Sequence, residues 1–245
     1  MKIKILLIIL LMCISSTSLY SQEMYLHGNI GYGFPATKTV IGARNDATFI
    51  ENVYGSWGAG LNLGAAIGAM FSEHVGAELG FSFLSGREYQ VSSTDTLGAL
   101  SEEASATMLR LIPALRISGG EKTKVYSRIG FVLGVSASWD ETFAGSIYGV
   151  PISGTATAEG GTAFGWTAAA GVSFSITDKS AFFAELYTIN MNWAPEEMKV
   201  YGTGFSYKLN FRDKVNANNA YEELKDYMPF NSTGVNLGII IMLGK

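Results

Sequence analysis

The feature that constrains this chain most is a strict alternation of apolar and small residues over residues 57–83. Before the break at residues 72–74, the odd-numbered positions are apolar and the positions between them are small or polar. After that short polar turn, the alternation resumes and places Glu78 on the small, polar face. Successive side chains of a β-strand point to opposite faces, so a period of two predicts two strands joined by a tight turn. The apolar set is Trp57, Ala59, Leu61, Leu63, Ala65, Ile67, Ala69, Phe71, Val75, Ala77, Leu79, Phe81 and Phe83.

The first arm of this hairpin is too long for an ordinary strand of a soluble sandwich. Such strands have about five or six residues, whereas a tilted strand of about 9–11 residues can cross a bilayer. An apolar outer face, a small polar inner face and a tight turn make the repeating unit of a transmembrane β-barrel. The stretch therefore predicts an all-β fold, a single antiparallel up-and-down transmembrane β-barrel.

Six further segments continue the pattern and bring the expected strand count to about eight. Pro35 ends the first of them, because proline cannot donate to a β-ladder. Pro113 is an awkward member of another, since a closed barrel has no free edge and Pro113 must lie at a bulge or leave one carbonyl unpaired. The segments are 24–34, 107–117, 125–137, 164–176, 181–192 and about 235–243.

The connections between these strands fall into two classes. Turns of a few residues follow the second, fourth and sixth strands, and the other connections have roughly twenty residues or more. Barrels of the outer membrane have short periplasmic turns and long extracellular loops, so both termini are expected in the periplasm. The longest connection, residues 193–230, contains a segment, 216–227, that could form a short helix.

The N-terminus has the composition of a secretory signal peptide. Lys2 and Lys4 precede an apolar run over residues 5–14, and small polar residues follow up to Gln22. We therefore expect a signal peptide over residues 1–21 and an outer-membrane β-barrel domain over residues 22–245. Cys13, the only cysteine, lies within the signal; a lipid-anchored cysteine is the alternative, although Met12 before it is not small. The mature chain then has no cysteine for a disulfide.

The charge balance excludes one class of partner. Loss of Lys2 and Lys4 with the signal reduces the 17 basic residues to 15, against 21 acidic ones. A net negative chain without a basic patch is not expected to bind nucleic acid.

Five charged residues fall on the faces that point into the expected barrel. Counting from the short turns places all of them except Arg110 at comparable heights near the periplasmic end, where they would form a buried ion network. An eight-stranded interior is just wide enough for side chains to fill it. The network is therefore expected to be structural, with a gate or selectivity ring as the alternative. The five are Glu78, Arg110, Arg116, Arg128 and Glu185.

No constellation in the sequence predicts catalysis, a cofactor or a metal. The two histidines, His27 and His74, fall far from the expected outer rim, and no group of histidines or acids has the spacing of metal ligands. The glycines of residues 58–64 lie within a strand pattern and not between a strand and a helix, so they do not make a dinucleotide-binding loop. We expect no catalytic residue, no cofactor-binding residue and no metal ligand.

Acidic pairs and aromatic residues mark the expected outer loops and rims. Three acidic pairs, Glu102–Glu103, Asp140–Glu141 and Glu196–Glu197, are expected at solvated loop tips, with binding of bridging cations as the alternative. Aromatic residues gather at two levels, as the interfacial belts of a membrane barrel require. The outer level is Tyr54, Trp57, Trp139, Phe164, Trp166 and Trp193, and the inner level is Phe71, Phe81, Phe174 and Phe182.

Four short segments resemble the small outer-membrane β-barrel family. Residues 31–35 (GYGFP), 76–81 (GAELGF), 112–116 (IPALR) and 234–238 (GVNLG) are similar to the opacity-protein and OmpX-like group, often labelled porin family and common in the Bacteroidetes. The resemblance covers the mature chain and implies a fold more than an activity. The chain departs from the pattern at its end, Leu243-Gly244-Lys245, because such barrels often finish on an aromatic residue that the insertion machinery reads.

These observations predict a non-enzymatic integral protein of the cell outer membrane, whose long loops serve surface interaction, adhesion or envelope integrity. The expected partners are outer-membrane lipid and lipopolysaccharide, the barrel-assembly machinery and an extracellular ligand of the loops. A narrow porin-like channel for small solutes is the first alternative, and a lipid-modifying enzyme is the second. A soluble lipocalin-like barrel would require the apolar faces to point inward.

Overall fold

The structure is a computed structural model that describes residues 23–37, 39–45, 48–95, 98–216 and 219–244. The expected signal peptide, residues 1–21, lies outside the described residues. Within these ranges no helix is long and apolar enough to cross a membrane.

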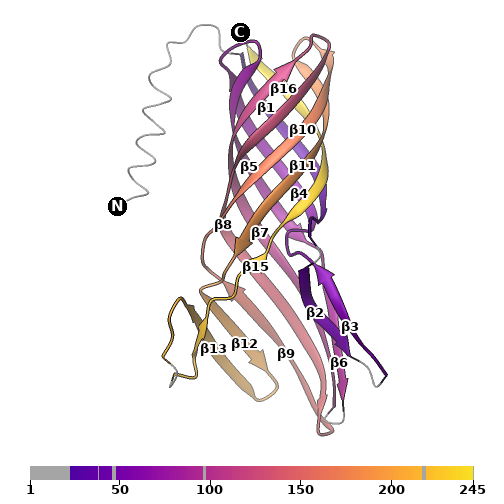
Figure 1. The fold of residues 1–245 in the computed structure, drawn as a ribbon, viewed down its shortest axis with the longest axis vertical. Helices are drawn as coiled ribbons and strands as arrows, with labels where there is room; N and C mark the ends of the chain where they lie inside the picture. The colour runs from indigo at the N-terminus through magenta and orange to yellow at the C-terminus, as the bar shows by residue number, and fades with distance from the viewer. Residues whose placement is uncertain (1–22, 38, 46–47, 96–97, 217–218, 245) are drawn as a thin grey trace.

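A closed ring of eight antiparallel strands forms the centre of the described chain (Figure 1). Each strand pairs with the next in chain order, β7 pairs with β8, and β16 pairs with β1 to close the ring. The all-β barrel expected from the alternation is confirmed. The ring is β1 (Glu23–Pro35), β4 (Gly60–Met70), β5 (Val75–Gly86), β7 (Gly98–Gly119), β8 (Thr123–Ile147), β10 (Ala163–Thr177), β11 (Ser180–Trp193) and β16 (Ser232–Gly244).

The strands of the ring face as the period-two pattern predicts. Leu61, Phe131 and Leu237 are exposed on the outside, whereas Glu78 and Glu185 are buried in the lumen. A continuous belt of apolar side chains on the outside is favourable only when it contacts lipid, because in water this apolar surface would remain exposed.

The two ends of the barrel differ (Figure 1). One end carries the short turns after β4, β7 and β10, and we call it the turn end. At the other end, strands continue beyond the ring as a projecting sheet. This sheet contains β2 (Thr39–Asn45), β3 (Ile50–Gly55), β6 (Tyr89–Asp95), β9 (Val150–Glu159), β12 (Glu197–Gly202), β13 (Phe205–Arg212), residues 98–104 of β7 and residues 138–147 of β8.

The projecting sheet corrects the expectation that the long connections are irregular loops. Four segments expected as loops form strands in the order β13-β12-β9-β8 on one side and β7-β6-β2-β3 on the other. The expected helix over residues 216–227 is wrong: its described part contains β14 (Glu222–Leu224), which pairs with β13 in parallel. A further short strand, β15 (Met228–Pro229), pairs with β11.

A bulge explains why the sequence pattern of β8 seemed to end early. Leu109 pairs with Ser136 and Arg110 pairs with Gly134, so Val135 is an extra residue in β8. A bulge of one residue exchanges the faces of all positions that follow. Beyond it the odd-numbered positions point inward, and the alternation appears broken although the strand continues.

The first residues of the hairpin also differ from the prediction. β4 begins at Gly60, and Trp57 and Ala59 precede it and are buried instead of lipid-facing. The amide of Ala59 bonds the carbonyl of Ser56 in a turn, and Gly60 has a φ of 142°, a conformation that favours glycine. This turn redirects the chain before the strand starts.

Three tryptophans expected in the outer aromatic level lie elsewhere. Trp57 and Trp193 are buried at the mouth of the barrel, and Trp139 is partly buried beside them. Phe164 and Trp166 do lie exposed on the outside.

Pro113 lies in an unbroken ladder on one side of β7 and at a gap in the pairing on the other side. It pairs with Leu79 of β5, whereas the pairing of β7 with β8 passes from Leu111–Leu133 to Ala114–Gly130 without a change of register. Pro113 thus lies at an interruption of that ladder and not at the bulge.

Candidate functional site

The lumen near the turn end holds a compact ion network. Glu78 receives hydrogen bonds from Arg116 at 2.9 Å and from Arg128 at 2.9 Å. Arg128 also bonds Glu185, so one guanidinium joins both carboxylates. The four residues come from β5, β7, β8 and β11, on opposite sides of the barrel. We call these four residues the ion network.

Polar and aromatic side chains complete the environment of the two carboxylates. Tyr25 donates to Glu78 at 2.6 Å and Tyr126 donates to Glu185 at 3.0 Å. Asn236 donates to Glu185 at 2.8 Å. The guanidinium carbon of Arg116 lies 4.0 Å from the ring centroid of Tyr126, within the range of a cation–π contact. Each of the two carboxylates therefore accepts several hydrogen bonds, as buried charges require.

Arg110 lies apart from the ion network. It is fully buried and donates to Asn62 at 3.1 Å. Its Nε and Nη2 have no hydrogen-bond partner within the described ranges. The structure thus brings together four of the five charged residues that the sequence placed in the lumen and leaves the fifth without a carboxylate partner among the described residues.

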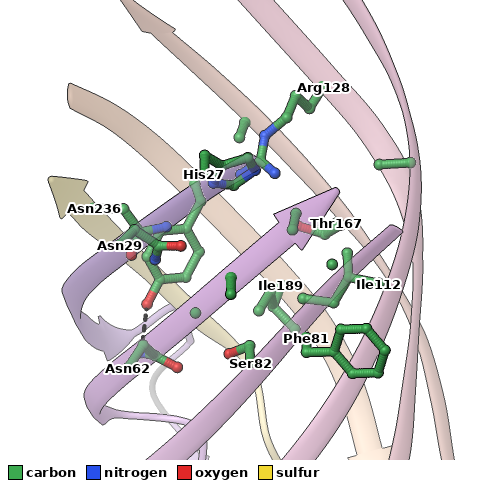
Figure 2. Close-up of a pocket in the computed structure, with 17 residues that line it drawn as sticks. His27, Asn29, Asn62, Phe81, Ser82, Ile112, Arg128, Thr167, Ile189 and Asn236 are labelled. Carbon is green, nitrogen blue, oxygen red and sulfur yellow. Dashed lines mark hydrogen bonds between the residues drawn. The ribbon is translucent and has the colours of Figure 1, made fainter. Parts of the chain in front are cut away.

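A small chamber separates Arg110's partner Asn62 from the ion network (Figure 2). Its volume is about 50 Å³, enough for more than one water molecule. His27, Asn236 and Arg128 line it, and each has at least one buried nitrogen or oxygen without a partner among the described residues. Polar atoms of this kind are normally satisfied by ordered water.

The mouth opposite the turn end is closed by an apolar cluster. Trp57 packs edge-to-face on Tyr89 and on Trp139, and Trp193 packs in the same way on Phe230. The segment before β4 is held against β15, because the backbone amide of Trp57 donates a hydrogen bond to the carbonyl of Pro229 at 2.9 Å. We call these five aromatic residues the mouth cluster.

The inner face of the projecting sheet carries two of the expected loop acids. Glu141 pairs with Ala104 and Phe143 pairs with Glu102, so the carboxylates are diagonal neighbours across β7 and β8. Burial raises the pKa of Glu141 to about 7, and the charge of Glu102 adds to the effect.

The other acids of the outer segments are solvated or paired. Asp140 accepts hydrogen bonds from Ser138 and Thr157 at 2.9 Å each. Hydrogen bonds from Lys208 and Lys199 lower the pKa of Glu197 to about 2. The described residues contain no group of three or more histidine, cysteine or acidic side chains that could hold a metal.

Neither histidine lies at the mouth. His27 is buried in the lumen, with its Nε2 3.7 Å from Glu78 and its ring 5.3 Å from that of Phe183. His74 lies in the turn after β4, where its Nδ1 is 3.2 Å from the carbonyl of Ser118. The two histidines are thus near the turn end.

Sequence reasoning missed several members of the lumen site. Tyr25, Asn62 and Asn236 fall on inward positions of their strands, and a polar residue on an inward position is the signal that could have found them. Their partners could not be found in this way, because cross-barrel contacts depend on how far each strand is shifted against the next.

Two solved structures have similar folds. The major outer membrane protein from Thermus thermophilus has a TM-score of 0.51 and 9% identity, and the match covers 91% of this chain and 100% of that one. OprG, an outer membrane protein from Pseudomonas aeruginosa, has a TM-score of 0.50 and 11% identity, with 92% and 97% covered. At these identities the likeness concerns the fold alone. No curated protein sequence is similar enough to count as a relative.

A match to a family model shows which protein family this chain belongs to. The family described as "Outer membrane protein beta-barrel domain" matches residues 5–212, which is most of the chain. The lipid-facing apolar belt, the filled polar lumen and the eight-stranded ring agree with this match. The chain belongs to the outer membrane protein β-barrel domain family and is an integral outer membrane protein.

Proposed function

We propose that this protein is a non-enzymatic surface-interaction protein of the outer membrane: the barrel is the anchor, and the projecting sheet contacts partners outside the cell. The observation that carries the proposal is that the connections expected as loops are ordered strands joined to the barrel by continuous backbone pairing. Binding residues are commonly presented by a rigid scaffold, because a surface ordered in advance loses little entropy on binding.

The edge of the projecting sheet offers a specific contact surface. Phe205 and Tyr207 of β13 stack with ring centroids 6.2 Å apart, and each is 42% exposed. Aromatic side chains, phenylalanine and tyrosine among them, are enriched where proteins bind one another. Such a pair near a strand edge supports adhesion to another protein or cell surface more than a purely structural role.

The test compares vesicles that carry the protein with its projecting sheet outward. Fluorescent vesicles with the wild type, with F205S/Y207S or with no protein are applied to immobilised bacterial cells and to surfaces coated with collagen or mucin. The wild type is expected to be retained on at least one surface, and the double variant is expected to be retained several times less. The control is S206A, which changes the residue between the two aromatics. Retention of wild-type vesicles no greater than that of empty vesicles on all these surfaces would contradict the proposal.

A narrow channel for small solutes is the second candidate, and the polar chamber between Asn62 and Arg128 is the observation that favours it. The mouth cluster and the ion network lie on either side of this chamber and oppose a permanent water path. Conductance of the purified protein in planar bilayers distinguishes the two functions. Steady single-channel currents that an Arg128→Met exchange alters would support the channel.

A lipid-modifying enzyme has less support. Such an enzyme needs a nucleophile and a base at the outer rim, where the lipid headgroups lie. Both histidines are near the turn end, far from that rim.

A further inference from the structure

The charges in the lumen do not balance. Among the described residues, three arginines and two glutamates are buried or largely buried inside the ring, and His27 could only add positive charge. The ion network holds two of these arginines and both glutamates, so it is neutral in itself. The lumen therefore has an excess of one positive charge. This excess lies on Arg110, which is fully buried and outside the ion network.

The guanidinium of Arg110 has one edge without partners. Its Nη1 donates to Asn62 at 3.1 Å, whereas its Nε and Nη2 have no hydrogen-bond partner in the part of the chain that the structure describes. Nε and Nη2 lie on the same side of the planar group, so each directs one N–H bond, nearly parallel to the other, at the same place. We call these two atoms the free edge of Arg110.

The described neighbours of Arg110 bring no negative charge to the free edge. The amide nitrogen of Asn62 donates to the hydroxyl of Tyr187 at 2.8 Å (Figure 2), so its amide oxygen is the atom left for Arg110. In the ladders, Arg110 pairs with Ser82 on one side and with Gly134 on the other, and both are uncharged. A guanidinium that is shielded from water without a counter-ion is costly.

The kind of unpaired atom distinguishes an anion from a water molecule. In the chamber, the unpaired atoms include an acceptor, Oδ1 of Asn236, and a donor, Nε of Arg128, and water satisfies both kinds. The free edge of Arg110 consists of donors only, and these donors carry the positive charge. A negatively charged acceptor satisfies the donors and the charge together, whereas water satisfies the donors alone.

The packing around Arg110 favours a small anion. A side chain added at Gly134, the partner of Arg110 on β8, would lie 3.0 Å from Sδ of Met108 and 3.4 Å from Cε of Met191. Methionine side chains are unbranched and adaptable, so these two can move aside by the width of one atom. A monatomic anion needs no more than that, whereas a polyatomic one such as phosphate would require several side chains to move.

We propose that the lumen binds one small monovalent anion of the chloride class on the free edge of Arg110. The anion is the counter-ion that the residues of the barrel do not supply. This site lies inside the membrane anchor and is independent of the contact surface on β13. Because the unfolded chain has no such site, the stability of the barrel rises with the concentration of the anion.

Urea-induced unfolding in lipid vesicles tests this dependence. The salt is sodium chloride or sodium gluconate at the same concentration, so the ionic strength is constant and the size of the anion changes. In the wild type, the folding equilibrium constant is expected to be about threefold higher in about 0.3 M chloride than in gluconate, as for a dissociation constant of about 0.15 M. Tryptophan fluorescence follows the transition.

Two variants separate this effect from a general effect of salt. Arg110→Met lacks the free edge and is expected to be equally stable in the two salts. The matched control is Arg87→Met, which removes an exposed arginine just after β5 and should keep the threefold difference. The proposal is overturned if chloride has no effect on the wild type, if Arg110→Met keeps the effect, or if Arg87→Met loses it.

Crystals of the wild type soaked in sodium bromide locate the anion directly. The anomalous signal of bromide is expected within hydrogen-bonding distance of both Nε and Nη2 of Arg110. Ordered water alone at the free edge contradicts the proposal. Bromide at this place without a chloride effect on unfolding also contradicts it, because the anion would then bind at crystal concentration only. The position of bromide decides the matter if Arg110→Met does not fold.

Discussion

The guanidinium of Arg110 donates a hydrogen bond to the side-chain oxygen of Asn62 at 3.1 Å, although Arg110 is fully buried. In the same lumen Arg128 contacts two carboxylates. The barrel therefore contains buried cations that are compensated by carboxylates, such as Arg128, and one, Arg110, whose described hydrogen-bond partner is a neutral amide. Removing Arg128 or Arg110 should have very different consequences.

Replacement of Arg128 by methionine should lower the free energy of unfolding by about 3–5 kcal/mol. Glu78 and Glu185 would lose their shared partner and remain buried with less compensation, which is the costly change for an ion pair. Urea-induced unfolding in lipid vesicles, followed by tryptophan fluorescence, measures the difference. A loss below about 1 kcal/mol would show that water reaches the carboxylates and that the lumen is not closed.

Replacement of Arg110 by methionine should change the free energy of unfolding by less than about 1 kcal/mol. The loss of the hydrogen bond to Asn62 costs about 1 kcal/mol, and removal of a buried charge without a carboxylate partner offsets it. The same urea titration compares this variant with Arg128→Met. Equal losses for the two variants would contradict the distinction between them.

Leu63→Arg should impair insertion of the barrel. Leu63 is exposed on the lipid-facing side of β4, where an arginine costs about 2–4 kcal/mol near the bilayer midplane. The readout is the yield of heat-modifiable protein after folding into vesicles. Val40→Arg is the control, because Val40 is also exposed but lies in the projecting sheet away from lipid; a normal yield of Leu63→Arg would refute the assigned facing.

The projecting sheet should lose stability as the pH rises towards 7. The pKa of Glu141 in the folded protein is about 7, above its ordinary value of 4.5, so the folded state holds the proton more tightly. The favourable contribution is complete below about pH 4.5 and is lost as the pH rises through 7. Its size is about 1 kcal/mol, since water partly screens this carboxyl.

Glu141→Gln should remove this dependence on pH. Amide hydrogen exchange of β8 and β9 at pH 5 and at pH 8, corrected for the intrinsic exchange rate, measures it. Glu103→Gln is the control, because Glu103 lies on the opposite face of β7 and accepts a hydrogen bond from Gln90. Identical protection of the wild type and Glu141→Gln at both pH values would show that Glu141 does not titrate in this range.

The ring of strands could be predicted from the sequence because lipid imposes one rule on every position. Leu61 and Phe131 must be apolar where they face lipid, and this requirement leaves a period of two in the sequence. The projecting sheet obeys no such rule. Water surrounds most of it, so its outward positions accept both polar and apolar residues and leave no regular period in the sequence. In addition, the bulge at Val135 exchanges the two faces of β8 just where the membrane pattern ends.

The candidate site was also predictable only in part. Glu78, Arg116, Arg128 and Glu185 could be placed in the lumen and at one level, because their parity and their distance from the short turns are countable. The same count placed Arg110 at a different level, but its hydrogen bond to Asn62 could not be foreseen, because Asn62 lies on β4, which does not pair with β7. The pairing of β15 with β11 at Asn192 and Trp193 could not be predicted either, because it joins segments about 35 residues apart and no local pattern encodes it.

The length of β8 sets how far from the cell this protein can act. The strand has 25 residues and, at about 3.3 Å each, is about 80 Å long, whereas the hydrocarbon layer is about 30 Å thick. Even when the strand is inclined by about 40°, its tip stands well above the headgroups. A partner that cannot penetrate the carbohydrate layer close to the bilayer could still meet the tip, so shortening β8 and β9 by equal numbers of residues would change the distance of encounter without touching the membrane anchor.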